Sequence, residues 1–398
     1  MQIDLKSQKW LAVWLMSVLV FQTVVGFGNF PPLAFITVIL RYVSILNFVL
    51  VTYLYVRQAQ VSALDILTGV YLVLFVVSTL LSGTYISGAV HRCTEILTLL
   101  MTLSYYRHYM PLLLKTLAVT FSICVYLNGL AMILFPTWML AADNEFDCFL
   151  LGGNYNQMGG RMLPAIVFNL LCVPYSKKWI ASTVVLSIVS IVTLAFVGSM
   201  TSLTSLLLML LCCLIPSKRM LKMALAGLIA FVVLFQCLIV FSGEGLHDNR
   251  LMVYLVEEVL HKDLTFTYRT YLWDSAGRAF AQSPLLGYGN VDTDWYYVHV
   301  NAGAIGPHNF IYNILLQGGV SLLTVLAGIM YTCVRPIVRA NSRPALLMAI
   351  AVVVLFVMML MEVYPFLFLF MLLAIMFYFP QLYPTEQSTI KESVSCPK

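Results

Sequence analysis

Charged residues are scarce in this chain. Asp, Glu, Lys and Arg make up 10% of its 398 residues, whereas 61% are hydrophobic. Soluble domains carry roughly 25% charged residues, and no water-soluble fold of this length can hide so much apolar surface. The composition therefore excludes the soluble classes and predicts a protein with several membrane spans.

Cysteine patterns that indicate metal binding or disulfide frameworks are also absent. The nine Cys form no C-x-x-C and no Cys/His cluster, and most of them lie inside apolar runs, where a free Cys behaves as a small hydrophobe. We expect no metal and no cofactor. Internal repeats and low-complexity linkers are missing as well, which predicts one integral membrane domain over residues 1–398. The net charge of +5 comes from bases spread over short loops, so it indicates no nucleic-acid partner.

Long apolar runs fill most of the chain and predict an all-α polytopic bundle of about twelve transmembrane helices. The first run has no small-residue cleavage site and is followed by further spans, so we expect it to be retained as a helix. The expected helices lie near residues 10–27, 32–56, 64–82, 88–106, 111–136, 154–174, 179–197, 199–215, 220–241, 307–334, 344–361 and 363–380.

Lys and Arg are missing from the short loops on one side of this expected bundle. The bases of the other side are Lys6, Lys9, Arg57, Arg107, Lys177, Lys178, Lys218, Arg219, Lys222, Arg335, Arg339, Arg343, Lys391 and Lys398. Positive residues in short loops face the cytoplasm, whereas long loops are exempt from this rule. Both termini are therefore predicted to be cytoplasmic. The long loop 242–306 is predicted to be extracytoplasmic and partly helical.

Polar side chains interrupt the sixth expected helix. Asn154, Gln157 and Arg161 follow spacings that place them on one helix face. The purely apolar part, 162–173, is too short to span a membrane alone, so the polar half must face protein or a water-filled cavity. We therefore expect these three residues to contact a substrate.

Other charges inside apolar runs have a structural interpretation. Arg92 and Glu95 are three residues apart and can pair on one helix. Arg41 and Lys115 fit snorkelling or paired charges. We expect no functional role for these four residues.

The stretch 265–319 carries the most chemistry. A helix is expected from about Thr267 until Ser283-Pro284 and Gly287 stop it, with Arg269 and Trp273 four residues apart on one face. Pro307 is expected to start the next helix, with His308 and Asn309 in its first turn. We expect Trp273 and Asn309 to contact the substrate. Free N–H groups at a helix start bind anions, and the helix dipole disfavours an imidazolium there. We therefore expect His308 to be neutral and able to act as a general base.

Three motifs of this stretch resemble the bacterial O-antigen ligase and polysaccharide polymerase superfamily. They are Arg269-x-x-x-Trp273, Pro284-x-x-Gly287-x-Gly289 and His308-Asn309. The resemblance implies a metal-independent transfer of a polyprenyl-diphosphate-linked oligosaccharide at the outer leaflet of the bacterial cytoplasmic membrane. It also implies an Arg pair on the diphosphate, a His near the attacking hydroxyl and a surrounding of membrane lipids. The protein partners that the resemblance implies are chain-length regulators and flippases.

One position departs from the ligase pattern. Ligases resemble one another in a Ser-Arg near the start of a mid-chain helix, where this chain has Ser199-Met200-Thr201. Arg161 is the expected replacement for the missing Arg. Together with Arg269 it would grip the diphosphate, and we predict that both guanidinium groups line one cavity with His308 on its wall.

Three functions remain open on the sequence. The leading hypothesis is a polymerase that joins repeat units, and it is favoured by the segment 153–157, which resembles repeat-unit polymerases. The first alternative is a ligase that moves a finished glycan to a lipid or protein acceptor. The second is a transporter or flippase, which would be expected to show inverted repeats and paired helix breaks. The sequence shows neither of these features.

Overall fold

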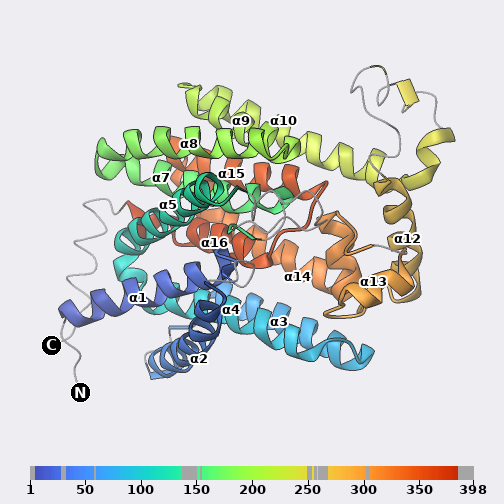
Figure 1. Ribbon diagram of the computed structural model, residues 1–398, viewed down its shortest axis with the longest axis horizontal. Coiled ribbons are helices and arrows are strands. Elements are labelled where there is room, and N and C mark those ends of the chain that lie inside the picture. Colours follow the sequence, from blue (N-terminus) through green and yellow to red (C-terminus); the bar gives the residue numbers. More distant parts are fainter. Residues whose placement is uncertain are drawn as a thin grey trace.

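The computed structural model describes residues 5–27, 33–57, 60–136, 150–152, 155–248, 253–254, 258, 268–301 and 304–383. Over these residues the chain forms helices and no strand (Figure 1). Helices occur at all twelve expected positions: α1 (Leu5–Val24), α2 (Ala34–Arg57), α3 (Ala63–Ser82), α4 (Ile86–Tyr105), α5 (Met110–Leu134), α7 (Gly159–Cys172), α8 (Lys178–Phe196), α9 (Met200–Leu214), α10 (Lys218–Phe235), α14 (Phe310–Ala340), α15 (Arg343–Met359) and α16 (Phe366–Phe377).

Seven of the described helical segments are long and apolar enough to cross a membrane. They are Ala34–Arg57, Ala63–Ser82, Arg107–Leu134, Tyr155–Tyr175, Lys178–Phe196, Lys218–Val240 and Phe310–Ala340. Three apolar helices, α9, α15 and α16, are shorter. The all-helical multi-pass membrane protein predicted from the composition is confirmed, and the count of twelve spans stays a prediction.

The shortest of these helices lies deepest in the protein. All residues of α16 from Phe366 to Met376 are buried, although its 12 residues extend for only about 18 Å. A bilayer core is about 30 Å thick, so α16 cannot cross it alone. The irregular segment 360–365 that precedes it is enclosed by the bundle: Leu360, Glu362 and Tyr364 are all buried.

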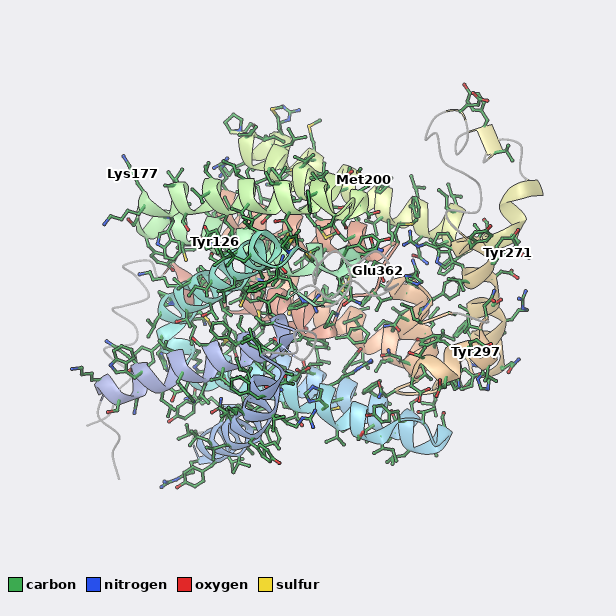
Figure 2. All side chains as sticks on the ribbon, viewed as in Figure 1. Tyr126, Lys177, Met200, Tyr271, Tyr297 and Glu362 are labelled. Carbon is green, nitrogen blue, oxygen red and sulfur yellow. The ribbon has the colours of Figure 1, made fainter. Side chains whose placement is uncertain are left out.

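The loops of the bundle gather at two opposite ends. At one end Lys218 Nζ donates to the carbonyl of Asn341, and Lys177 lies there too, at the left of Figure 2. Helices α12 (Arg269–Gln282) and α13 (Thr293–His299) form the other end, where Tyr271 and Tyr297 are seen at the right of Figure 2. Lys177 and Lys218, two of the bases that set the predicted orientation, therefore lie at the end opposite to α12 and α13 of the long loop.

A sharp turn of the long loop fills a break in α14. The helix loses its regular backbone at residues 318–319, two consecutive glycines. Carbonyls just before the break would lose their helical donors. The turn supplies new donors: Tyr288 N–H bonds to Leu316 O at 2.6 Å, and Gly289 N–H bonds to Gln317 O at 2.8 Å. The Gly287-x-Gly289 motif thus forms the turn whose N–H groups bond to the carbonyls of α14.

The same turn also packs on α3. Gly289 has a positive φ of 73°, and a Cβ placed on it would lie 2.2 Å from Thr79 Cα. Asn290 N–H donates to Thr79 Oγ1 at 3.0 Å, and its side-chain amide donates to Tyr85 O at 2.8 Å. The loop is thus held between α14 and the α3–α4 turn.

We expect Gly289→Ala to destabilise the protein strongly. The methyl group would collide with backbone, and overpacking of this kind costs about 1–3 kcal/mol in addition to roughly 1–2 kcal/mol for the left-handed backbone. Gly198→Ala is the matched control, because Gly198 has a φ of 71° and open space around its Cβ position. Thermal unfolding of the purified protein in detergent measures both. Equal losses in the two variants would show that the turn is not held against α3.

Candidate functional site

His308 stands immediately before α14 in an unusual backbone conformation. The helix begins at Phe310 with Asn309 as its N-cap, so His308 does not lie in the first turn as the sequence predicted. Its φ is +45°, in the left-handed region, which costs a non-glycine residue about 1–2 kcal/mol. Such strain is concentrated at functional sites. Tyr268, directly before Arg269, also has a positive φ, of 64°.

Asn309 has a structural role at this helix start. Its side chain is fully buried. The amide oxygen accepts from Tyr312 N–H at 3.1 Å, and the amide nitrogen donates to Gln236 Oε1 at 2.9 Å and to Leu360 O at 3.1 Å. These bonds account for the donor and acceptor atoms of the side chain, and the substrate contact predicted for Asn309 stays a prediction. Asn309 fixes the position of its neighbour His308.

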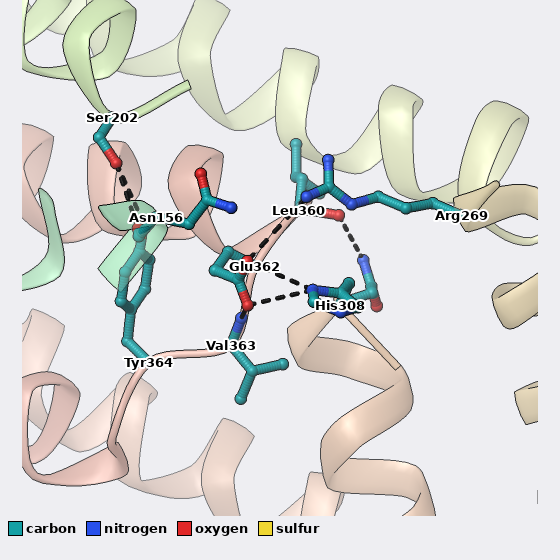
Figure 3. A network of polar contacts seen from close by, with 9 residues as sticks. Asn156, Ser202, Arg269, His308, Leu360, Glu362, Val363 and Tyr364 are labelled. Carbon is teal, nitrogen blue, oxygen red and sulfur yellow. Dashed lines mark hydrogen bonds and ion pairs between the residues drawn. The ribbon is translucent and has the colours of Figure 1, made fainter. Parts of the chain in front are cut away.

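Glu362 joins the two residues that the sequence predicted to be catalytic. His308 Nδ1 lies 3.2 Å from both carboxylate oxygens of Glu362, and Arg269 Nη2 lies 4.0 Å from Oε2 (Figure 3). The carboxylate is 8% exposed. Sequence reasoning did not identify Glu362, although a single acidic residue between two apolar runs was a visible signal.

The charges of this trio support one another. Burial alone would raise the pKa of Glu362, but the hydrogen bond and charge of His308, the Val363 N–H and the charge of Arg269 together hold that pKa below its ordinary value. Burial lowers the pKa of Arg269, and Glu362 opposes that shift. A carboxylate can only accept hydrogen bonds, so in the neutral imidazole of His308 the proton lies on Nδ1 and the lone pair on Nε2.

A cavity of about 580 Å³ opens beside His308 and Glu362. Binding pockets for small molecules have volumes of roughly 300–1,000 Å³. The polar part of its wall comes from the start of α4 and the turn before it, from the turn before α7, from the long loop with the start of α14, and from the segment before α16: Tyr85, His91, Arg92, Glu95, Gln157, Asn290, Asp292, Thr293, Tyr296, His308, Asn313, Gln317, Glu362 and Tyr364. Residues from four distant parts of the chain therefore meet in one cavity.

The predicted two-arginine arrangement differs from the observed one. Arg161 is 5% exposed, with Nη1 donating to Gln157 O at 2.9 Å and its guanidinium 5.3 Å from the centre of the Phe368 ring. Among the described residues, the cavity wall includes His308 but neither Arg161 nor Arg269. The shared wall predicted for the two guanidinium groups is not seen in this cavity and stays a prediction. Their roles toward a diphosphate stay predictions.

The other predicted contacts fall in different places. Gln157 lines the cavity but sits in a short 3-10 turn (Tyr155–Gln157) ahead of α7, so it does not share a continuous helix face with Arg161. Asn154 lies outside the described residues. Trp273 is fully buried and belongs to the apolar core under α12, and its substrate contact stays a prediction.

The ion pair expected between Arg92 and Glu95 is not formed. Glu95 Oε1 instead lies 3.5 Å from Nε2 of His91, one turn earlier on α4. Arg92 faces the cavity. The structural role expected for Arg92, that of an ion-pair partner of Glu95, is therefore not seen.

A comparison with protein families identifies the part of the chain that holds these groups. Residues 182–327 match the O-antigen ligase family. This O-antigen ligase segment runs from α8 through α12 and α13 into α14, and it contains both Arg269 and His308. The resemblance drawn from the motifs is confirmed over this segment. No curated protein matches the chain. Glu362 and Arg92 lie outside the O-antigen ligase segment, so the site is completed by residues that the match does not cover.

Proposed function

We propose that the protein is a membrane glycosyltransferase that joins polyprenyl-diphosphate-linked oligosaccharide units into a surface polysaccharide, O-antigen or capsule. The observation that carries this proposal is the Glu362–His308 pair on the wall of a cavity, with His308 and Arg269 supplied by the O-antigen ligase segment. The reaction needs no cofactor from the protein, because a glycosyl diphosphate already contains a good leaving group.

The geometry supports a simple transfer. Nε2 of His308 takes the proton from an acceptor hydroxyl as its oxygen forms a bond to the anomeric carbon of the donor sugar. The bond between that carbon and the diphosphate oxygen breaks, and the lipid diphosphate leaves with the electron pair. A positioned general base contributes roughly 10²–10⁴ in rate. Glu362 holds the imidazole through Nδ1 and stabilises the imidazolium that forms, as carboxylates do beside catalytic histidines.

Arg269 is suited to the diphosphate side of this reaction. It comes from the start of α12 and approaches the Glu362 carboxylate from one side. A guanidinium has five N–H donors, so its contact with one carboxylate oxygen leaves donors for phosphate. Arg binds phosphate oxygens in a bidentate manner. We propose that it neutralises the leaving diphosphate.

The proposed location is the outer face of the bacterial cytoplasmic membrane, with both termini in the cytoplasm. It rests on the separation of the basic loops from the long loop along the bundle. Chain-length regulators and flippases are the proposed protein partners, and the donor and surrounding lipids are the proposed small-molecule partners.

A cysteine at Gly245 tests this orientation. The position is exposed, and nothing lies within 4 Å of its Cβ site. In a background that lacks the exposed native Cys237 and other reactive cysteines, we expect a membrane-impermeant thiol reagent to label Gly245→Cys in intact cells. Labelling seen only after lysis would reverse the orientation.

The alternative of a ligase has one observation in its favour, which is the description of the matched family. It would transfer a finished glycan once to a lipid or protein acceptor. Ligases have an Arg at the position of Met200, which is 61% exposed. The missing Arg argues against a ligase.

The product pattern separates the proposed function from its alternatives. Purified protein in lipid vesicles is given a polyprenyl-diphosphate-linked repeat unit, and the lipid-linked products are separated by size. A polymerase gives a ladder with regular spacing. A single addition that requires a separate acceptor would indicate a ligase, and movement of the donor across the bilayer without a new bond would indicate a flippase.

A further inference from the structure

Arg92 is the arginine on the wall of the cavity that His308 and Glu362 line. Three arginines lie in this part of the bundle, but among the described residues Arg92 alone of the three contributes to the cavity wall. It comes from the first turns of α4, across from His308 and Glu362. Arg161 and Arg269 reach other groups, the Gln157 carbonyl and the Glu362 carboxylate.

Among the residues that the structure describes, the guanidinium of Arg92 makes no hydrogen bond, no ion pair within 4 Å and no aromatic ring contact. It interacts only at longer range, with Tyr296, Tyr71 and Glu95. The nearest acidic residue along the helix, Glu95, is paired with His91 instead. A charge of this kind inside a membrane bundle is costly unless it is compensated, and it is by default a sign of function.

The wall of the cavity carries the carboxylates of Glu95, Asp292 and Glu362, whereas the groups next to Arg92 include neutral donors for a bound anion. Asn313, Gln317 and Tyr296 form a chain of hydrogen bonds next to the cavity, with Tyr296 Oη at 3.3 Å and Gln317 Nε2 at 3.1 Å from Asn313 Oδ1. Gly88 allows the Asn290 amide to approach α4 closely, since a Cβ there would lie 2.4 Å from Asn290 Nδ2. The cavity is large enough for a diphosphate with its first sugar.

We propose that Arg92 binds the diphosphate of the lipid-linked donor inside this cavity. A phosphate held on the α4 wall presents the anomeric carbon toward the wall that carries His308. The charge on Arg92 also stabilises the negative charge that grows on the diphosphate as it leaves. The inference rests on the proposed function for the identity of the donor. Arg92 would then fill the place for which Arg161 was predicted, from α4 instead of α7.

A binding experiment tests this assignment without glycosyl transfer. The probe is farnesyl diphosphate, a short-chain lipid diphosphate, added to the purified full-length protein in detergent, and the readout is the rise in thermal stability that a ligand of the native state produces. We expect the probe to stabilise the wild type. Arg92→Gln should weaken binding about tenfold or more, because charge-assisted contacts to phosphate are lost. Arg92→Lys should restore binding in part, since Lys keeps the charge but not the bidentate geometry.

Three further variants complete the design. Arg41→Gln is the matched control: Arg41 lines the neighbouring cavity between α1, α2 and α4, so its removal should leave probe binding unchanged. Without the probe, Arg92→Gln should be as stable as the wild type or more stable, because an uncompensated charge is removed. His308→Ala should still bind the probe. Unchanged binding in Arg92→Gln, or no binding in the wild type, would overturn the assignment of Arg92. Binding through Arg92 in a protein that forms no polymer would overturn the proposed reaction alone.

Discussion

His308→Ala should abolish polymer formation while the protein accumulates and folds normally. The variant loses the general base, which is worth roughly 10²–10⁴ in rate. The helix start does not depend on His308, because Asn309 provides the cap and the bond to Leu360 O. The measurement is the product ladder in vesicles together with thermal unfolding of the same preparations. Polymer at the wild-type rate would remove His308 from the mechanism.

A glycine at the same position sharpens this test. His308 has a φ of +45°, which a glycine adopts without steric cost. His308→Gly should therefore be inactive and yet at least as stable as His308→Ala. A lower protein level in both variants would instead indicate a purely structural role for the imidazole at the start of α14.

Glu362→Gln should reduce the rate by up to about 10⁴, the loss seen when a carboxylate that orients a catalytic histidine is neutralised. The amide has the same shape but cannot stabilise the imidazolium, and it leaves the buried Arg269 without its charge partner. Initial rates of sugar transfer at saturating donor measure the loss. Asp274→Asn is the matched control, since it breaks an exposed ion pair with Arg278 on α12, and such pairs contribute little. A rate near that of the wild type would exclude Glu362 from catalysis.

The same variant has a signature in the dependence of stability on pH. The pKa of Glu362 is lower in the folded protein than its ordinary value of 4.5. Its charge therefore contributes stability above the unfolded pKa, and this contribution is lost as the pH falls through the folded pKa. Between neutral pH and the acid range, wild-type protein should lose more stability than Glu362→Gln. Parallel curves would show that the carboxylate gains nothing from His308 and Arg269.

The helices could be predicted because a membrane leaves the backbone few alternatives. Apolar runs of sufficient length must form helices in lipid, and turn residues such as Pro284 and Gly287 ended α12 where the sequence placed its end. The long loop was harder, because its turn owes its place to Gly318 and Gly319 of α14. This break in α14 creates a binding site for a distant turn. It does not show in the hydrophobic periodicity of either segment.

Residues of the candidate site could be predicted only where they belong to short sequence motifs. Arg269 and His308 were identified, whereas Glu362 reaches His308 from 54 residues further along the chain, and no spacing rule connects them. Arg161 was assigned to a face by counting from Asn154, but α7 starts only at Gly159. The turn before it rotates Gln157 away from that register. Arg92 was interpreted as half of an ion pair because the rule for pairs on one helix does not include competition from His91.

The two glycines of α14 divide that helix into parts with different attachments. The first part, residues 310–317, follows His308, and its last carbonyls are bonded to the loop through Tyr288 and Gly289. The second part continues as a helix beyond residue 319. Asn309 bonds to Gln236 and Leu360 at the start of the first part, so residues 310–317 are held at both ends. The turn of the long loop thus contributes to the position of His308, although it is bonded to the far end of this short helical segment.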